Sequence, residues 1–157
     1  MRKFALALLV TLVAVPAFAQ LPNPYGASIA LESARKIAAL SVAEANKNGW
    51  KMAIAIVDTA GDLVYFEKMD GTQVASVNIA QDKARSSVRF KRPTKAMQDV
   101  LAAGGAGVRF LALQGAIPVE GGLPLIMDGK IVGAIGASGG TSDQDGLAAK
   151  AGADSAK

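Results

Sequence analysis

The sequence predicts an α+β fold in which helices flank a central antiparallel sheet of about five strands. Two segments each hold a pair of short β-rich runs around a Gly-containing turn, which is the pattern of a β-hairpin. Two longer segments have apolar residues three and four positions apart, which is typical of amphipathic helices. Because hairpins rather than crossover helices join most of the strands, we expect the sheet to be antiparallel.

The first helix is expected between Ser28 and Asn48. Either Ser28 or the stretch Ala30-Leu31-Glu32 marks its start, and Asn48-Gly49 supplies the stop. A broad apolar face runs along the segment and is formed by Ile29, Ala34, Ile37, Ala38, Leu40, Ala43 and Ala45.

The first hairpin follows directly. Its strands are expected at residues 54–57 and 63–66, on either side of a turn at residues 59–62 that contains Gly61. A second amphipathic helix is expected from Thr72 to Phe90, and Pro93 ends it. Thr94 is then expected to cap a short helix that runs through Leu101.

Residues 102–122 are rich in glycine and predict a turn, one short strand near Ala116–Val119 and a loop. The second hairpin is clearer, because Asp128-Gly129 between two apolar runs is the signal of a type I′ turn. The chain is expected to close with an Ala-rich helix from Asp143 to about Ala153.

Residues 1–19 have the features of a secretory signal peptide. Arg2 and Lys3 precede an apolar run, and the run is followed by Pro16 and the small-residue pattern Ala17-Phe18-Ala19. Residues 20–27 predict an extended lead-in, and residues 28–157 predict a single domain. We therefore expect a periplasmic or secreted protein with no stable membrane anchor after cleavage.

The composition narrows the class of protein. The chain has no cysteine, so the domain is expected to hold together without disulfides. Without the leader it carries 15 basic and 13 acidic side chains, a weak net charge. Six basic residues do cluster between Lys83 and Lys95, but a single aromatic residue, Phe90, lies among them, which is too few for a surface that stacks successive bases. Nucleic acid is therefore not an expected partner.

The glycine-rich stretch "VGAIGASGGTSDQDG", residues 132–146, suggests three kinds of site. Its glycines resemble a dinucleotide fingerprint, but too few residues follow for the second strand of a Rossmann unit. Gly136–Gly140 also matches the G-x-S-x-G elbow of serine hydrolases. The chain has no histidine to act as the base, so a turn or capping role is favoured for Ser138.

The third interpretation is an anion site. Backbone N–H groups from Ser138 to Ser142 lie at the start of the last expected helix, where a carboxylate or phosphate is attracted. The simpler alternative is that Thr141 or Ser142 only caps that helix. With no histidine, no cysteine and no recognisable catalytic constellation, an enzyme is the least favoured class.

Three ordered motifs carry a family resemblance. They are "ALESARKIAALSVAEANKNGWKMAIAIVDTAGDLVYFEKMDG" (30–71), "IAQDKARSSVRFKRPT" (79–94) and "GGLPLIMDGKIVGAIGASGGTSDQDGLAAKAG" (121–152). Over about residues 28–155 the chain resembles the GlcG/HbpS family, which includes the C-terminal domain of PduO. The resemblance implies a profilin-like fold, homo-oligomers and haem binding, with haem degradation proposed for some members.

The chain differs from that family in the residue that would bind the haem iron. A PduO-type domain is associated with a histidine haem ligand, and this chain has no histidine. The remaining candidates are a lysine, a threonine or one of Tyr25, Tyr65, Met52, Met69, Met97 and Met127. For each of these residues a purely structural role is the alternative to iron binding, so the sequence does not predict which residue would bind the metal.

Two hypotheses follow from the resemblance. The first is a secreted protein that binds haem or a related tetrapyrrole, and the second is an oligomeric interaction protein whose pocket binds another small anion or a protein partner. Lys83, Arg85 and Arg89 could pair with haem propionates, or they could complement the dipole at the end of their helix. The predicted ligand-binding residues are Ser138, Gly139, Gly140, Thr141, Lys83, Arg85 and Arg89.

Overall fold

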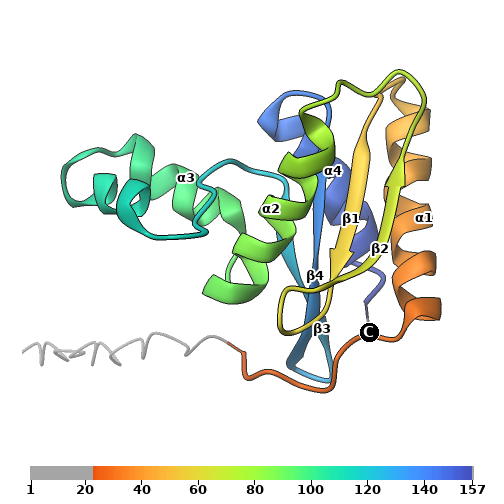
Figure 1. Cartoon of the computed structure of the whole chain (residues 1–157), viewed down its shortest axis with the longest axis horizontal. Coiled ribbons are helices and arrows are strands. Elements are labelled where there is room, and N and C mark those ends of the chain that lie inside the picture. Colours follow the sequence, from red (N-terminus) through yellow and green to blue (C-terminus); the bar gives the residue numbers. More distant parts are fainter. Residues whose placement is uncertain (1–22, 157) are drawn as a thin grey trace, which may run out of the picture.

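A computed structural model describes residues 23–156 of the chain (Figure 1). The expected leader, residues 1–19, and the first residues of the lead-in lie outside the described residues. The elements in chain order are α1 (Leu31–Lys47), β1 (Ala53–Val57), β2 (Leu63–Lys68), α2 (Ser76–Phe90), α3 (Thr94–Ala102), the 3₁₀ helix η1 (Gly105–Ala112), β3 (Gly122–Met127), β4 (Lys130–Ser138) and α4 (Ser142–Ala153).

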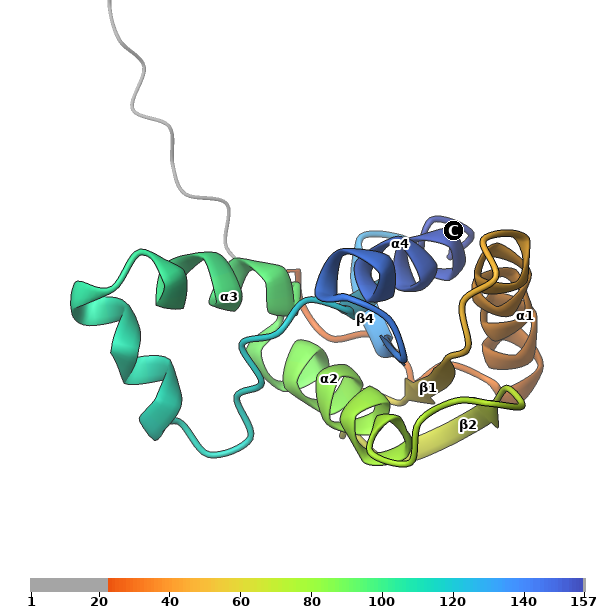
Figure 2. The same cartoon turned by 90° about the horizontal axis from the view of Figure 1, so that it is seen from above.

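The strands form one antiparallel sheet in the order β2-β1-β4-β3. Helices cover both faces: α2 lies on one side of the sheet, and α1 and α4 lie on the other (Figure 2). The predicted α+β class with an antiparallel sheet between helices is therefore confirmed. None of the helices in residues 23–156 is long and apolar enough to cross a membrane.

Within residues 23–156 the sheet has four strands rather than about five. The strand expected near Ala116–Val119 is absent, and this segment has no regular secondary structure. Pro118 has no N–H group to donate to a ladder, and the N–H of Ile117 is donated to the Ser86 hydroxyl of α2 at 2.9 Å. The short apolar run therefore crosses the surface of α2 as a loop.

Both predicted hairpins are present, and local turn chemistry explains them. In the first turn one carboxylate oxygen of Asp58 accepts the N–H groups of Ala60, Gly61 and Asp62. In the second turn Asp128 and Gly129 have φ angles of 49° and 71°. Two consecutive positive φ angles are what a type I′ turn requires, so that prediction is confirmed.

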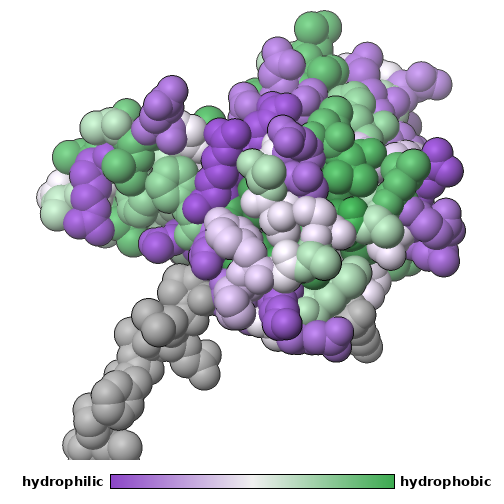
Figure 3. Space-filling view, turned by 60° about the horizontal axis from the view of Figure 1, so that its bottom comes forward, coloured by the Kyte–Doolittle hydropathy of each residue, from purple (hydrophilic) through white to green (hydrophobic). Residues whose placement is uncertain are grey.

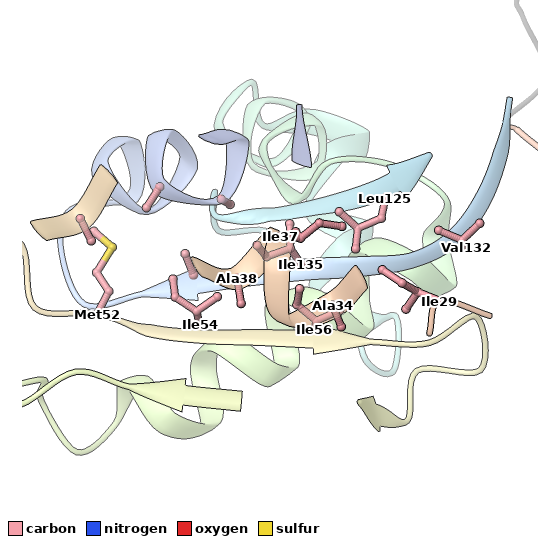
Figure 4. Close-up of a cluster of buried hydrophobic side chains, with 14 residues drawn as sticks. Ile29, Ala34, Ile37, Ala38, Met52, Ile54, Ile56, Leu125, Val132 and Ile135 are labelled. Atoms are coloured by element: carbon pink, nitrogen blue, oxygen red, sulfur yellow. The ribbon is translucent and has the colours of Figure 1, made fainter. Parts of the chain in front are cut away.

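The main core lies between the sheet and the pair α1 and α4. Ile54 and Ile56 of β1 and Ile135 of β4 point toward Ile37 of α1, as Figure 4 shows, and Leu125 of β3 completes the layer. All five side chains are almost fully buried. Along β1 the residues alternate, with Ile54 and Ile56 facing this layer and Ala53 and Ala55 facing the other side, which fixes the register of that strand.

The opposite face packs closely against α2 through small side chains. Ala53 and Ala55 of β1 contact Ala80 of α2, and Ala134 of β4 contacts Ala84. Gly136 lies directly under the helix, and a Cβ atom there would collide with the backbone oxygen of Ala80. The glycine is therefore required because strand and helix backbones approach each other here.

The segment from α3 through η1, which we call the arm, projects from the body of the domain (Figure 1). The short helix expected from Thr94 through Leu101 is present as α3, whereas η1 was not predicted. Apolar side chains gather on the surface of the arm (Figure 3). The most exposed of them are Leu111, at 71%, and Val108, at 56%.

The described part of the lead-in, residues 23–27, contacts the sheet. Its N–H at Gly26 is donated to the carbonyl of Ile131, and the N–H of Ile131 is donated to the carbonyl of Pro24, both at 2.8 Å. These bonds form a parallel bridge between Tyr25 and Ile131. Residues 130–133 of β4 extend beyond the end of β1, and the lead-in pairs with β4 there.

Candidate functional site

The glycine loop, Gly139–Thr141, connects the end of β4 to the start of α4. Thr141 is the N-cap of the helix, because its hydroxyl accepts the N–H of Gln144 at 3.4 Å. In return the Gln144 side chain accepts the N–H of Thr141 at 3.0 Å. This pair is a capping box, so Thr141 rather than Ser142 caps α4.

Ser138 is the last residue of β4 and pairs with Ala53 in β1. Its side chain is buried, and its hydroxyl donates to the hydroxyl of Ser76 at the start of α2, at 3.1 Å. The interpretation of Ser138 as a turn or capping residue is wrong. The side chain instead joins the strand to α2.

Lys83 and Asp145 form a buried ion pair beside this loop. The two side chains are 1% and 5% exposed, and the Lys83 Nζ lies 2.6 Å from the Asp145 Oδ2. Lys83 also donates to the carbonyl of Ala137 at 3.3 Å, and Asp145 Oδ1 accepts the N–H of Gly140 at 3.0 Å. The pair therefore connects α2, β4, the glycine loop and α4.

Several forces act on the Asp145 carboxyl. Burial raises its pKa, whereas the Lys83 ammonium and the N–H groups of Gly140 and Gly139 favour the charged form and oppose that rise. The Asp145 carboxylate therefore accepts hydrogen bonds from the same N–H groups that the sequence predicts would bind a ligand anion. The role of Lys83, Gly139, Gly140 and Thr141 in ligand binding stays a prediction, and a ligand anion would have to replace this carboxylate.

Arg85 and Arg89 lie away from the loop. Arg85 donates its Nε hydrogen to the carbonyl of Gly61 at 3.3 Å, and the Arg89 guanidinium packs against Gly61 in the β1–β2 turn. That turn follows Val57, at one end of the sheet, while Ser138 lies at the other end. The structure therefore does not bring the predicted residues into one site.

Thr94 and Glu120 are polar residues that the sequence patterns do not place in a site. Thr94 does not cap α3; it is fully buried, and its hydroxyl accepts the N–H of Gly122 at 2.9 Å. The Glu120 side chain is 17% exposed, and its Oε2 has no hydrogen-bond partner within residues 23–156 and lies 3.8 Å from the Lys95 Nζ. Burial raises the pKa of Glu120, and the Lys95 ammonium opposes that rise.

A sequence signal for the buried ion pair exists only at Lys83. This residue lies three positions after Ala80 and next to Ala84, so it falls on the apolar face of α2. A lysine on that face needs a buried counter-charge. Nothing local identifies Asp145 as the partner, because acidic residues in the first turn of a helix are also favoured by the helix dipole.

A surface cavity of about 530 Å³ lies beside the edge strand β3, and we call it the β3 cavity. This volume is within the range of roughly 300–1,000 Å³ that is usual for small-molecule sites. The apolar part of its lining consists of Pro93, Leu123, Pro124, Ile126, Ile131, Ala153 and Ala156.

Two lysines bring positive charge to the β3 cavity. Lys150 of α4 lines it and donates to Asp154 at 2.7 Å. Lys91, just after α2, also lines it, and its Nζ lies 4.2 Å from the centre of the Tyr25 ring. An apolar ligand that carries carboxylates would find complementary groups here.

The fold places this protein among the small profilin-like α+β domains, which have helices on both faces of an antiparallel sheet. A model of the family described as "Haem degrading protein HbpS-like" matches residues 29–154, so the chain belongs to the HbpS-like family. No group of three or more acidic, His or Cys side chains that could hold a metal ion occurs in residues 23–156.

Individual relatives agree with this assignment. The chain is similar to Protein GlcG of Escherichia coli K12, with 35% identity over 107 residues, which is 68% of this chain and 78% of GlcG. A crystal structure of a double mutant of HbpS from Streptomyces reticuli is similar to 90% of this chain and 97% of that one, with 29% identity and a TM-score of 0.75. The structure of a PduOC:heme complex covers 81% of this chain and 94% of its own, with 23% identity and a TM-score of 0.73, and supports the fold alone.

Proposed function

We propose that this chain is an exported protein that binds a small amphipathic ligand, haem or a related tetrapyrrole, in the β3 cavity. The observation that carries the proposal is the apolar lining of that cavity together with Lys91 and Lys150. The macrocycle of a tetrapyrrole is apolar, and its propionate carboxylates can pair with the two ammonium groups. The family description supports this class of ligand.

The residues present fit the ring and the carboxylates of haem but not its iron. Met52 and Met97 are fully buried, so their sulfur atoms are inaccessible to a ligand. The Tyr25 hydroxyl donates to the carbonyl of Val88 at 2.9 Å, and the Tyr65 hydroxyl donates to Glu67 at 2.9 Å. No histidine or cysteine exists in the chain. We therefore derive no chemistry through the iron.

The test is a haem titration followed through the Soret band. The wild-type protein should give a saturable change, and Ile126→Glu should abolish it, because a carboxylate in the lining repels propionates and removes apolar contact. Leu63→Glu is the matched control, since Leu63 lies on the other edge strand with 45% exposure, against 39% for Ile126. A wild-type spectrum that never saturates would refute the proposal.

A second function is favoured by the arm. Its exposed Leu111 and Val108 suit a contact with a second copy of this chain or another protein, since large exposed apolar patches mark interaction surfaces. This supports the oligomeric interaction protein as the alternative. Light scattering of the wild type and of Leu111→Glu tests it: a mass that falls to one chain in the variant supports the arm as an interface. A wild type that is already monomeric contradicts it.

A further inference from the structure

We propose that the β3 cavity recognises its ligand without a metal bond, so that an iron-free tetrapyrrole dicarboxylate binds as tightly as haem. This inference rests on the proposed function and specifies its ligand class. It follows from the donor atoms that the lining offers.

The lining offers few atoms that could bond to iron. Among residues 23–156 no methionine or tyrosine lines it, and its polar members are Asn23, Lys91, Lys150 and Asp154. The Asn23 side-chain amide donates to the carbonyl of Gly129 at 2.8 Å. The ammonium of Lys150 and the carboxylate of Asp154 are bound to each other at 2.7 Å.

The ammonium groups are also poor iron ligands in these positions. The Lys150 nitrogen is already engaged, because it donates to the Asp154 carboxylate at 2.7 Å. Lys91 lies over the ring of Tyr25, a contact that an ammonium cation makes through its positive charge. As cations, both lysines suit carboxylates rather than iron.

What remains for binding is apolar contact and charge. The seven apolar residues of the lining can contact a macrocycle, and the two lysines can pair with its carboxylates. Both contributions depend on the organic part of the ligand alone. Removal of iron should therefore leave the affinity nearly unchanged, whereas removal of the carboxylate charges should lower it.

The experiment compares three probes with the mature protein: haem, iron-free protoporphyrin and its dimethyl ester. Quenching of the single tryptophan, Trp50, reports binding of each. The dissociation constants of haem and protoporphyrin should agree within about threefold. The ester should bind about two- to fivefold more weakly for each carboxylate that can no longer pair with a lysine, the scale of an exposed ion pair.

Two variants locate the binding site. Lys150→Gln should weaken haem and protoporphyrin by the same factor and should not affect the ester. Lys95→Gln is the matched control, because Lys95 forms the same i,i+4 pair with an aspartate, Asp99, on α3 and does not line the cavity. It should leave all three affinities unchanged.

The outcomes separate the inference from the proposed function. Haem binding at least tenfold tighter than protoporphyrin, or a haem spectrum typical of an axial protein ligand, would overturn the inference and leave the proposed function intact. Equal binding that Lys150→Gln and Ile126→Glu do not alter would overturn both the inference and the proposed site, since the ligand would then bind outside the β3 cavity. If none of the three probes binds, the proposed function itself fails.

Discussion

Removal of the buried ammonium at Lys83 should be among the most damaging single changes in this domain. Lys83→Met keeps the length of the side chain but leaves the Asp145 carboxylate, 5% exposed, with backbone N–H donors alone. Breaking a buried pair by removing one partner typically costs about 3–5 kcal/mol. That is a large part of the roughly 5–15 kcal/mol that stabilises a typical domain.

Urea unfolding followed by the fluorescence of Trp50 measures this cost. At a slope of about 2 kcal/mol per molar urea, the midpoint of Lys83→Met should fall by about 1.5–2.5 M. The double variant Lys83→Met/Asp145→Asn removes both charges and keeps an oxygen that can accept the N–H of Gly140. It should therefore be more stable than Lys83→Met alone, with a coupling of up to about 3 kcal/mol.

The exposed pair between Lys95 and Asp99 supplies the control, because both side chains are more than half exposed. Lys95→Met should leave the midpoint almost unchanged. If Lys83→Met does not fold, a folded double variant still supports the reasoning. A midpoint shift below about 0.5 M for Lys83→Met, or strictly additive effects in the double variant, would refute it.

Four further outcomes are expected. Gly136→Ala should cost about 1–3 kcal/mol in thermal unfolding, because the new methyl group meets the backbone of Ala80. Thr141→Ala should cost about 1 kcal/mol through loss of the N-cap, measured in the same way. Burial raises the pKa of Glu120 above its ordinary 4.5, so its ionisation destabilises the fold: stability is highest below the unfolded pKa and falls as pH rises through the folded pKa. Glu120→Gln should thus gain stability relative to wild type at pH 7 but not at pH 4. Intact-mass measurement of exported protein should show a chain that begins at Gln20, and retention of Met1 would contradict the expected cleavage.

Local chemistry explains which parts of the fold could be predicted from the sequence. The second hairpin could be predicted from Asp128-Gly129 alone, because these two adjacent residues determine the type of turn. The sequence predicts that Thr141 or Ser142 caps α4. The two hydrogen bonds between Thr141 and Gln144 identify Thr141 as the cap. The strand expected at Ala116–Val119 failed because a short apolar run does not by itself specify a ladder partner.

The candidate site was harder because its contacts are long-range. Lys83 and Asp145 are 62 positions apart, and no local pattern pairs them. Arg85 is only two positions from Lys83, yet it faces the β1–β2 turn, since residues two apart on a helix point in different directions. The β3 cavity combines β3, the end of α4 and the segment after α2, so it exists only in the folded chain.

The order of the strands determines when this domain can fold during synthesis. β4, which lies between β1 and β3, is the last strand to be made, and Asp145 follows it. A nascent chain that ends before Lys130 therefore has a two-stranded ribbon and a lysine with no counter-charge, and it should remain sensitive to protease while bound to the ribosome. Resistance should appear only when the C-terminal residues emerge. If residues 1–19 act as the expected export signal, this delay would leave the chain unfolded while it is being made, which is the state that translocation requires.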